Sequence, residues 1–174
     1  VALPESQVFT RLVKFPPLSD TEVASAIRWE AEQYIPIPLI EAQIQHFIVE
    51  RREISGVGAV EVLLVAAPKK LVEKYVKIIT LSGLEPIAVE TETLALVRSL
   101  APSNQTAFVV DFGASSTDIA IAKNGNLVFS RSIPTAGEAL TRAVATNLSV
   151  PATQAEEYKK SYGLSKEQLE GKVR

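Results

Sequence analysis

One stretch of this 174-residue sequence joins an apolar strand pattern, an acid and a small-residue turn. Residues 106–110 (T-A-F-V-V) predict a buried strand that delivers Asp111 to its end. Residues 113–116 (G-A-S-S) follow as a tight turn with several backbone N–H groups, and residues 117–122 predict a second strand. A strand, a small-residue turn and a strand can hold a phosphate through amides while the acid handles a hydrated cation.

Composition limits the partners and sites that the chain can offer. Hydrophobic residues make up 47% of the sequence and the net charge is −2, which predicts a globular core and no nucleic-acid partner. Cysteine is absent, which excludes disulfides and zinc–thiolate sites, and the single His46 is interpreted as a packing or surface residue. The longest apolar run is seven residues, 62–68, so direct membrane insertion is not expected.

The first half of the chain predicts a sheet packed on helices. Residues 7–15 alternate as a strand, and a capping-box pattern at residues 19–22 starts a helix. The apolar stripe of this helix is Val23, Ile27, Ala31 and Tyr34. Residues 42–52 and 58–67 predict an antiparallel strand pair. This pattern indicates an α+β unit.

A second helix is predicted to start at Pro68 and to end before Gly83. Its expected buried face consists of Leu71, Val72, Tyr75, Ile78 and Ile79. A short strand at residues 86–89 and a helix at residues 91–100 are expected to complete this unit. The best boundary signal in the chain follows at residues 101–104, A-P-S-N.

After the turn, Asn124-Gly125 predicts a two-residue hairpin and residues 127–133 a returning strand, so that three antiparallel strands are adjacent. A helix follows Gly137, and another runs from Pro151 to Tyr162. The stripe of the first of these helices is Leu140, Val144 and Leu148. Residues 165–168 are expected to cap a last short helix. Since no closing strand follows, the second unit is expected to be incomplete.

The Asp111-Phe112-Gly113 tripeptide has other interpretations. A plain β-turn remains open. A protein-kinase magnesium motif is excluded by context, since no His-Arg-Asp loop precedes it and a strand rather than an activation loop follows. An aspartic-protease motif is disfavoured because neither Thr-Gly nor Ser-Gly follows Asp111.

Residues 110–118, V-D-F-G-A-S-S-T-D, resemble the second phosphate loop of the actin-like ATPase superfamily, which includes the division protein FtsA. Residues 136–141 resemble its small-residue turn into a helix, and Glu156 with Lys159 resemble its Glu-x-x-Lys pair, which touches the nucleoside. Residues 27–36, I-R-W-E-A-E-Q-Y-I-P, are similar to the first-helix signature of the PilM family of type IV pilus assembly proteins.

The resemblance implies a partial actin-like (ribonuclease H-like) fold of class α+β to α/β. Residues 1–101 would form the inserted 1C-type subdomain with a connecting helix, and residues 105–174 the start of subdomain 2A/2B. The superfamily's first phosphate loop is absent from this chain, which begins Val-Ala-Leu-Pro and contains no Met. We therefore expect a piece of a longer protein that binds ATP weakly or not at all by itself.

In the full-length protein, the resemblance implies ATP and Mg²⁺ as ligands, with Asp111 ordering the water shell of the metal. The expected nucleotide-binding residues are Asp111, Gly113, Ala114, Ser115, Ser116, Thr117, Gly137, Glu156 and Lys159. An ordinary charge pair on a solvated helix remains the alternative for Glu156 and Lys159, and a turn requirement for Gly137. No catalytic base is identifiable, so ATP hydrolysis is expected to be slow at most.

The resemblance further implies a cytoplasmic protein at the inner-membrane face of the type IV pilus machinery. Its expected partners are the N-terminal peptide of a PilN-like membrane protein and other pilus assembly proteins, with the ATP state altering how it binds them. Two alternatives remain: a nucleotide-independent scaffold with a degenerate actin-like fold, and an FtsA-like cell-division scaffold.

Overall fold

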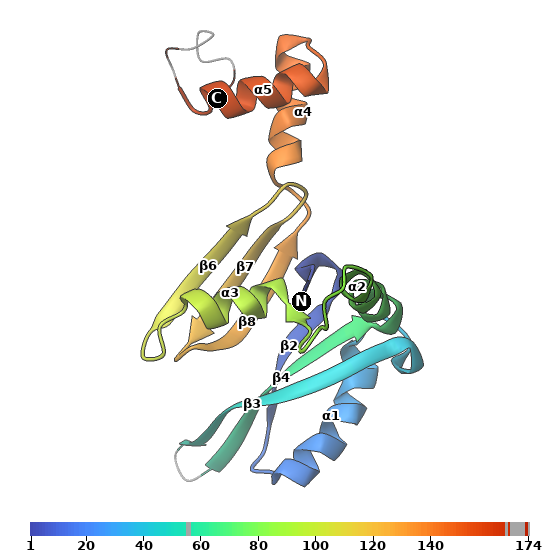
Figure 1. Cartoon of the computed structure of the whole chain (residues 1–174). Coiled ribbons are helices and arrows are strands. Elements are labelled where there is room, and N and C mark those ends of the chain that lie inside the picture. The colour runs from blue at the N-terminus through green and yellow to red at the C-terminus, as the bar shows by residue number, and fades with distance from the viewer. Residues whose placement is uncertain (55–56, 166, 168–172, 174) are drawn as a thin grey trace. The chain divides into compact units, whose positions relative to one another are not determined.

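The computed structural model describes residues 1–54, 57–165, 167 and 173 (Figure 1). The chain divides into two compact units, the first made of Val1–Val110 with Asp118–Arg131 and the second of Asp111–Thr117 with Ser132–Arg174. The subdomain boundary at residues 101–104 stays a prediction. Of the helix expected at residues 165–168, residues 166 and 168 lie outside the described residues.

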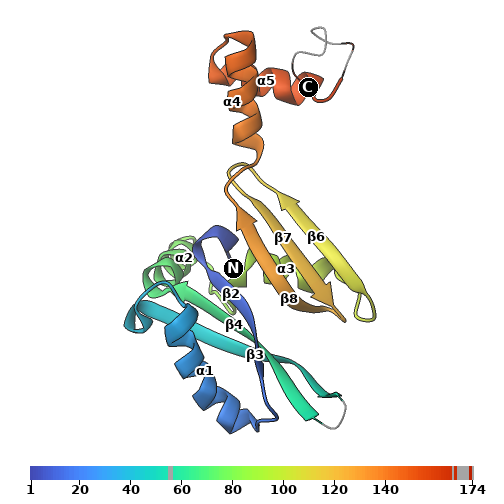
Figure 2. The same ribbon diagram turned by 180° about the vertical axis from the view of Figure 1, so that it is seen from behind.

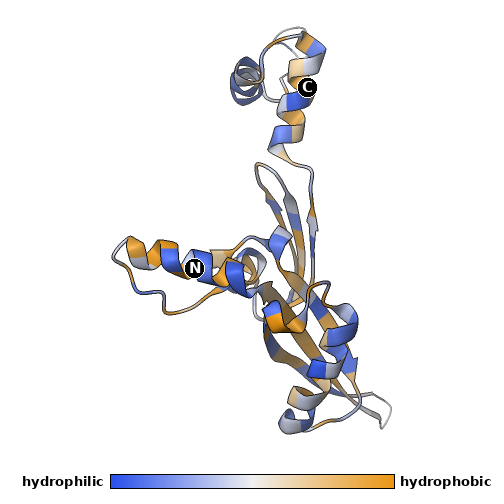
Figure 3. Ribbon diagram, turned by 90° about the vertical axis from the view of Figure 1, so that its right-hand side faces the viewer, coloured by the Kyte–Doolittle hydropathy of each residue, from blue (hydrophilic) through white to orange (hydrophobic). Residues whose placement is uncertain are grey.

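The first unit is built on an antiparallel sheet whose central strand is β4 (Val57–Pro68), flanked by β2 (Phe9–Phe15) and β3 (Ala42–Ile54) (Figures 1 and 2). Residues of opposite parity on β4 face opposite sides of the sheet, and one set packs against helix α1 (Asp20–Tyr34). That set is Val60, Val62, Leu64 and Ala66, all at most 2% exposed. Hydropathy colouring shows apolar and polar residues alternating along the strands (Figure 3).

Helix α1 follows the predicted pattern closely. The Ser19 hydroxyl accepts from the Glu22 amide while the Glu22 carboxylate accepts from the Ser19 amide, so both halves of the capping box are present. Val23, Ile27 and Ala31 are buried as predicted, whereas Tyr34 is half-exposed beneath the Arg11 guanidinium, 3.7 Å from its ring centre.

A β-bulge in β3 reverses which of its side chains face α1. Ile48 and Glu50 pair with the adjacent residues Val62 and Glu61, so Val49 is the extra residue. Beyond the bulge Arg51 reaches the start of α1, where it pairs with Asp20. The bulge thereby lets one strand contribute both to the core under α1 and to the anchoring of that helix.

Helix α2 (Lys69–Leu81) ends as predicted in a glycine cap, with Gly83 at φ +79°. Its predicted buried face is partly wrong. Only Leu71 is buried, Val72 and Tyr75 are half-buried, and Ile78 is 49% exposed. The reason is that the small cluster around Leu3 and Ala67 contacts only the first half of the helix.

The short strand expected at residues 86–89 is also misplaced. The observed strand is β5 (Glu90–Thr91), which pairs in parallel with β1 (Ala2–Leu3). Pairing with the first residues of the chain sets its position, since the Glu90 amide donates to the Val1 carbonyl at 3.0 Å. A 3-10 turn, η1 (Glu5–Gln7), then leads into β2, and another, η2 (Leu39–Glu41), leads into β3.

Helix α3 (Glu92–Leu100) leads into the second three-stranded sheet, which has the order β6 (Thr106–Phe112), β7 (Thr117–Lys123) and β8 (Asn126–Ile133). The predicted hairpin is present, with Asn124 and Gly125 both at positive φ. Val97 of α3 packs with Ala120, Ala122, Leu127 and Leu63 in one buried cluster. This cluster holds the strands on either side of the 113–116 turn.

Helices α4 (Gly137–Leu148) and α5 (Ala152–Tyr162) belong to the second unit. They pack together through a small apolar cluster of Val144, Ala155 and Val173. Of the predicted stripe on α4, Val144 is buried but Leu140 is 50% exposed. In the part of the chain that the structure describes, no helix is long and apolar enough to cross a membrane.

Candidate functional site

The turn loop, residues 113–117, is a tight reversal between β6 and β7. The Gly113 amide donates to the Ser116 carbonyl at 3.0 Å. A Cβ at position 113 would lie 3.1 Å from that same oxygen, so the turn favours glycine there. Ala114 and Ser115 at its tip are exposed. Within the described residues, their N–H groups have no hydrogen-bond partner and are available to an anion.

Two hydrogen bonds join the turn loop to the start of α4. The Gly137 amide donates to the Gly113 carbonyl at 3.1 Å, and the Glu138 amide donates to the Ala114 carbonyl at 2.8 Å. These two donors are among the first N–H groups of the helix, which would otherwise attract an anion. The amides that remain for a phosphate are therefore those of the loop rather than those of the helix end.

The side chains beside the loop set what else it can bind. The Thr117 hydroxyl donates to the Thr135 carbonyl at 2.6 Å, which leaves its lone pairs but no proton for a ligand. Asp111 is half-buried at the end of β6. No group of three acidic or histidine side chains suited to a metal occurs among the described residues. A single carboxylate such as that of Asp111 could hold Mg²⁺ only where water and phosphate oxygens supply the other ligands, the usual arrangement for this ion.

A polar cluster joins α5 to α4 close to this loop. Lys159 Nζ donates to the Gly137 carbonyl at 3.0 Å and to Thr141 Oγ1 at 2.9 Å. It also pairs with Glu156 Oε2 at 2.6 Å, while Lys160 Nζ lies 3.3 Å from Glu156 Oε1. Glu156 and Lys159, expected as a pair, are thus brought together, and both contact Thr141.

Electrostatics keep Glu156 ionised. The pKa of this carboxyl is lowered to about 2. The largest cause is the hydrogen bond from Lys159, and the next is the hydrogen bond from Thr141. At neutral pH the cluster therefore presents a carboxylate next to two ammonium groups, which can bind a hydroxyl-bearing ligand by accepting and donating hydrogen bonds.

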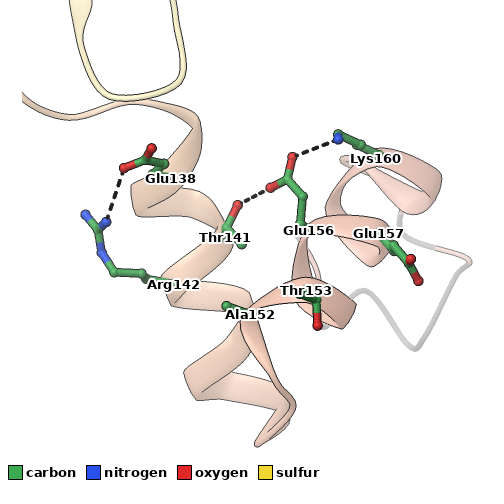
Figure 4. Close-up of a pocket in the computed structure, with 8 residues that line it drawn as sticks. All are labelled: Glu138, Thr141, Arg142, Ala152, Thr153, Glu156, Glu157 and Lys160. Atoms are coloured by element: carbon green, nitrogen blue, oxygen red, sulfur yellow. Dashed lines mark hydrogen bonds and ion pairs between the residues drawn. The ribbon is translucent and has the colours of Figure 1, made fainter.

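Two adjoining pockets surround the cluster. The first, of about 570 Å³, is lined by Phe112, Gly113, Ala114, Gly137, Glu138, Leu140, Glu156, Lys159 and Lys160. The second, of about 620 Å³, lies between α4 and α5 (Figure 4), where Glu156 reaches toward Thr141 and Lys160 while Arg142 pairs with Glu138. Their volumes fall in the range of small-molecule sites, and both pockets are open to solvent.

The pockets gather some predicted site residues and omit others. Gly113, Ala114, Gly137, Glu156 and Lys159 line the first pocket. The lining does not include the other four predicted residues, Asp111, Ser115, Ser116 and Thr117.

Thr141 and Lys160 belong to the polar cluster but were not predicted from the sequence as site residues. Thr141 is 8% exposed although it is polar, and a threonine four residues after Gly137 on a predicted helix was the available signal. Such a residue can hydrogen-bond the carbonyl one turn earlier, as Thr141 does at 3.0 Å to Gly137.

Comparison with known proteins places this chain in a family. Residues 1–171 match the family model described as type IV pilus assembly protein PilM. A solved PilM–PilN type IV pilus biogenesis complex superimposes with a TM-score of 0.76 at 26% identity, covering 93% of this chain and 50% of the solved chain. The cytoplasmic domain of EpsL from the type II secretion system of Vibrio cholerae shares the fold, with a TM-score of 0.57 at 11% identity over 86% of this chain and 55% of that one.

Curated relatives include other actin-like proteins. FtsA of Bacillus subtilis is 28% identical over 149 residues, 77% of this chain and 34% of FtsA. The ethanolamine utilization protein EutJ of Salmonella typhimurium is 36% identical over 86 residues, 49% of this chain and 30% of EutJ. The chain thus spans about a third of the length of these relatives. It has a partial actin-like ATPase fold and belongs to the PilM family of type IV pilus assembly proteins.

Proposed function

We propose that the protein is a nucleotide-binding assembly protein of the type IV pilus platform, with the turn loop and the α4–α5 cluster forming part of an ATP site. The observation that carries this proposal is that Ala114, whose amide has no partner among the described residues, lines one pocket together with Glu156 and Lys159. The amide suits a phosphate oxygen, while the carboxylate and ammonium pair suits a sugar hydroxyl.

Several predicted residues have a role in this proposal. The amides of Ala114 and Ser115 bind the β- and γ-phosphates, and Asp111 orders the water shell of Mg²⁺. The bound ion supplies charge neutralisation between the phosphates. Gly137 keeps the loop close to α4, since a Cβ there would lie 3.3 Å from the Gly113 carbonyl oxygen and 3.4 Å from Lys159 Nζ. No residue is assigned to catalysis.

Partner binding belongs to the same proposal. The solved relative is a PilM–PilN complex, which supports a PilN-like peptide as a partner of this protein. Binding such a membrane protein would hold the chain at the cytoplasmic face of the inner membrane. The nucleotide state would then alter the affinity of the protein for this peptide and for other pilus assembly proteins.

The test uses the protein at its full natural length, because this chain spans half of the solved relative. Mg-ATP and the N-terminal peptide of the PilN homologue are titrated separately by calorimetry into the wild type, Asp111→Asn and the control Asp20→Asn. We expect both ligands to bind the wild type and the control, and Asp111→Asn to lose at least tenfold in Mg-ATP affinity, since a charged contact is worth ~1.5–3 kcal/mol.

The outcomes separate the candidate functions. Peptide binding without Mg-ATP binding in the wild type would identify a nucleotide-independent scaffold. Absence of both would reject the assembly function. Equal losses in Asp111→Asn and Asp20→Asn would show that the magnesium role of Asp111 is wrong.

A further inference from the structure

Thr141 lies at the centre of the polar cluster on α4. Its hydroxyl is within hydrogen-bond reach of two acceptors, the Gly137 carbonyl at 3.0 Å and a Glu156 carboxylate oxygen, and it accepts from Lys159 at 2.9 Å. A hydroxyl has one proton, so it donates to one acceptor at a time while it accepts from the ammonium group. Thr141 therefore contacts both members of the charged pair on α5 from a different helix.

Thr141 is more buried than the two charged side chains that it contacts. The Thr141 residue is only 8% exposed, whereas the side chains of Lys159 and Glu156 are 23% and 35% exposed. Thr141 as a whole thus has little exposed surface and, of the two pockets, lines only the one between α4 and α5, whereas the two charged residues line the pocket beside the turn loop. A buried donor between two accessible charged groups fits a supporting role better than direct ligand contact.

The same hydrogen bonds connect the cluster to the turn loop. Lys159 donates to the Gly137 carbonyl, the Thr141 hydroxyl lies within reach of the same carbonyl, and the Gly137 amide donates to the Gly113 carbonyl. A continuous path of hydrogen bonds therefore runs from the loop through Gly137 to Lys159 and Glu156. Thr141 lies within hydrogen-bond reach of three residues of this path, Gly137, Lys159 and Glu156.

We propose that Thr141 is a positioning residue, which holds Glu156 and Lys159 in register with the turn loop so that a nucleoside sugar meets a preset carboxylate and ammonium pair. This inference rests on the proposed nucleotide site and adds a residue to it. Thr141 does not line the pocket beside the turn loop, so it acts on a ligand there through the pair. Its loss should weaken binding of the nucleoside part and spare binding of the phosphate part.

The experiment uses the full-length protein with Thr141→Val, which keeps the shape and removes the hydroxyl, and Thr141→Ser, which keeps the hydroxyl. The carboxyl pKa of Glu156 is measured by ¹³C NMR titration, and affinities for Mg-ATP and Mg-tripolyphosphate are measured by calorimetry. Tripolyphosphate carries the phosphates without the nucleoside, so the two ligands separate the two halves of the site.

In Thr141→Val we expect the pKa of Glu156 to rise from about 2 toward 4.5 by roughly one unit. We expect Mg-ATP affinity to fall on the order of tenfold, with unchanged Mg-tripolyphosphate affinity. Thr141→Ser should restore both values. An unchanged pKa, or an equal loss for both ligands, would overturn the inference.

Failure of the proposed function gives a different pattern. A wild type that binds neither ligand rejects the nucleotide site, and with it the sugar role, while the pKa of Glu156 still reports whether Thr141 holds the pair. If Thr141→Val does not fold, ¹⁵N NMR of the wild type tests the contact between Thr141 and Lys159. The Lys159 ammonium should exchange its protons more slowly than that of Lys160, and equal exchange rates would contradict the contact.

Discussion

Different forces stabilise two regions of this protein. One region is α1 with its sheet, and the other is the turn loop with α4 and α5. Between α1 and the sheet of β2, β4 and β3, ten buried apolar residues form one cluster. In the second unit, the apolar cluster of α4 and α5 has three buried members among the residues that the structure describes, and the contacts near the loop include hydrogen bonds and ion pairs. The first region depends on apolar burial and the second on polar geometry.

This difference indicates where ligand binding can occur without loss of the fold. Apolar burial is non-directional and supplies most folding free energy, whereas buried hydrogen bonds each contribute little net stability but fix positions. Residues 113–117 and the pair Glu156 and Lys159 can exchange hydrogen bonds with a ligand while the α1 core stays intact. Single substitutions in the two regions test this division.

Leu64→Ala tests the apolar region. Leu64 is 0% exposed on the central strand, so truncation should lower the free energy of unfolding by ~2–5 kcal/mol. Ile40→Ala removes the same number of carbons from a residue that is 81% exposed, and should change it by less than about 0.5 kcal/mol. Urea denaturation measures both. Similar losses in the two variants would show that the α1 core is not the main source of stability.

Gly137→Ala tests the polar region. The added Cβ would lie 3.3 Å from the Gly113 carbonyl oxygen and 3.4 Å from Lys159 Nζ, which strains both contacts. We expect about 1–2 kcal/mol of strain, seen as a five- to thirtyfold loss of Mg-ATP affinity in calorimetry. The control Ala139→Gly relaxes the same helix turn without adding an atom. Unchanged affinity in Gly137→Ala would show that the loop and α5 need no close approach at this residue.

Ser19→Ala tests the local cap of α1. Loss of the capping box should lower the free energy of unfolding by ~1 kcal/mol, while Ser25→Ala, whose hydroxyl donates only to the Thr21 carbonyl, should change it less. Hydrogen bonds from Ser19 lower the pKa of Glu22, so this stabilisation is present above the ordinary pKa of 4.5 and is lost as pH falls. Chemical denaturation between pH 3 and 7 should show a weaker pH dependence in Ser19→Ala.

The smallest effect is expected from the charge of Glu156. Its pKa is lowered to about 2, so the stabilisation of the α4–α5 contact is complete above 4.5 and is lost as pH falls toward 2. Glu156→Gln should remove this dependence, and the exposed neighbour Glu157→Gln should preserve it. Thermal melts across this range measure the change. A steeper acid loss in Glu157→Gln than in the wild type would contradict the assignment.

Local signals made several elements predictable. The capping box and the spacing of Val23, Ile27 and Ala31 define α1 within one segment, and Asn124-Gly125 defines a hairpin from two residues. The order of strand, small-residue turn and strand at residues 106–122 likewise needs no distant partner. These features depend on neighbours in sequence, which a sequence displays directly.

Features set by distant partners were harder to predict. The position of β5 depends on pairing with β1, about ninety residues earlier, and the exposure of Ile78 depends on what packs against α2. In the candidate site, the closeness of Glu156 and Lys159 follows from helical spacing. Their contacts with Thr141 and Gly137 depend on how two helices cross, which sequence spacing does not specify.

Hydrogen–deuterium exchange of the full-length protein, with and without Mg-ATP, tests the nucleotide site most directly. Mg-ATP should slow exchange at the amides of Ala114 and Ser115 and in the first turn of α4, and should leave α1 unchanged. Unchanged exchange in the turn loop at saturating Mg-ATP, or protection confined to α1, would contradict the account.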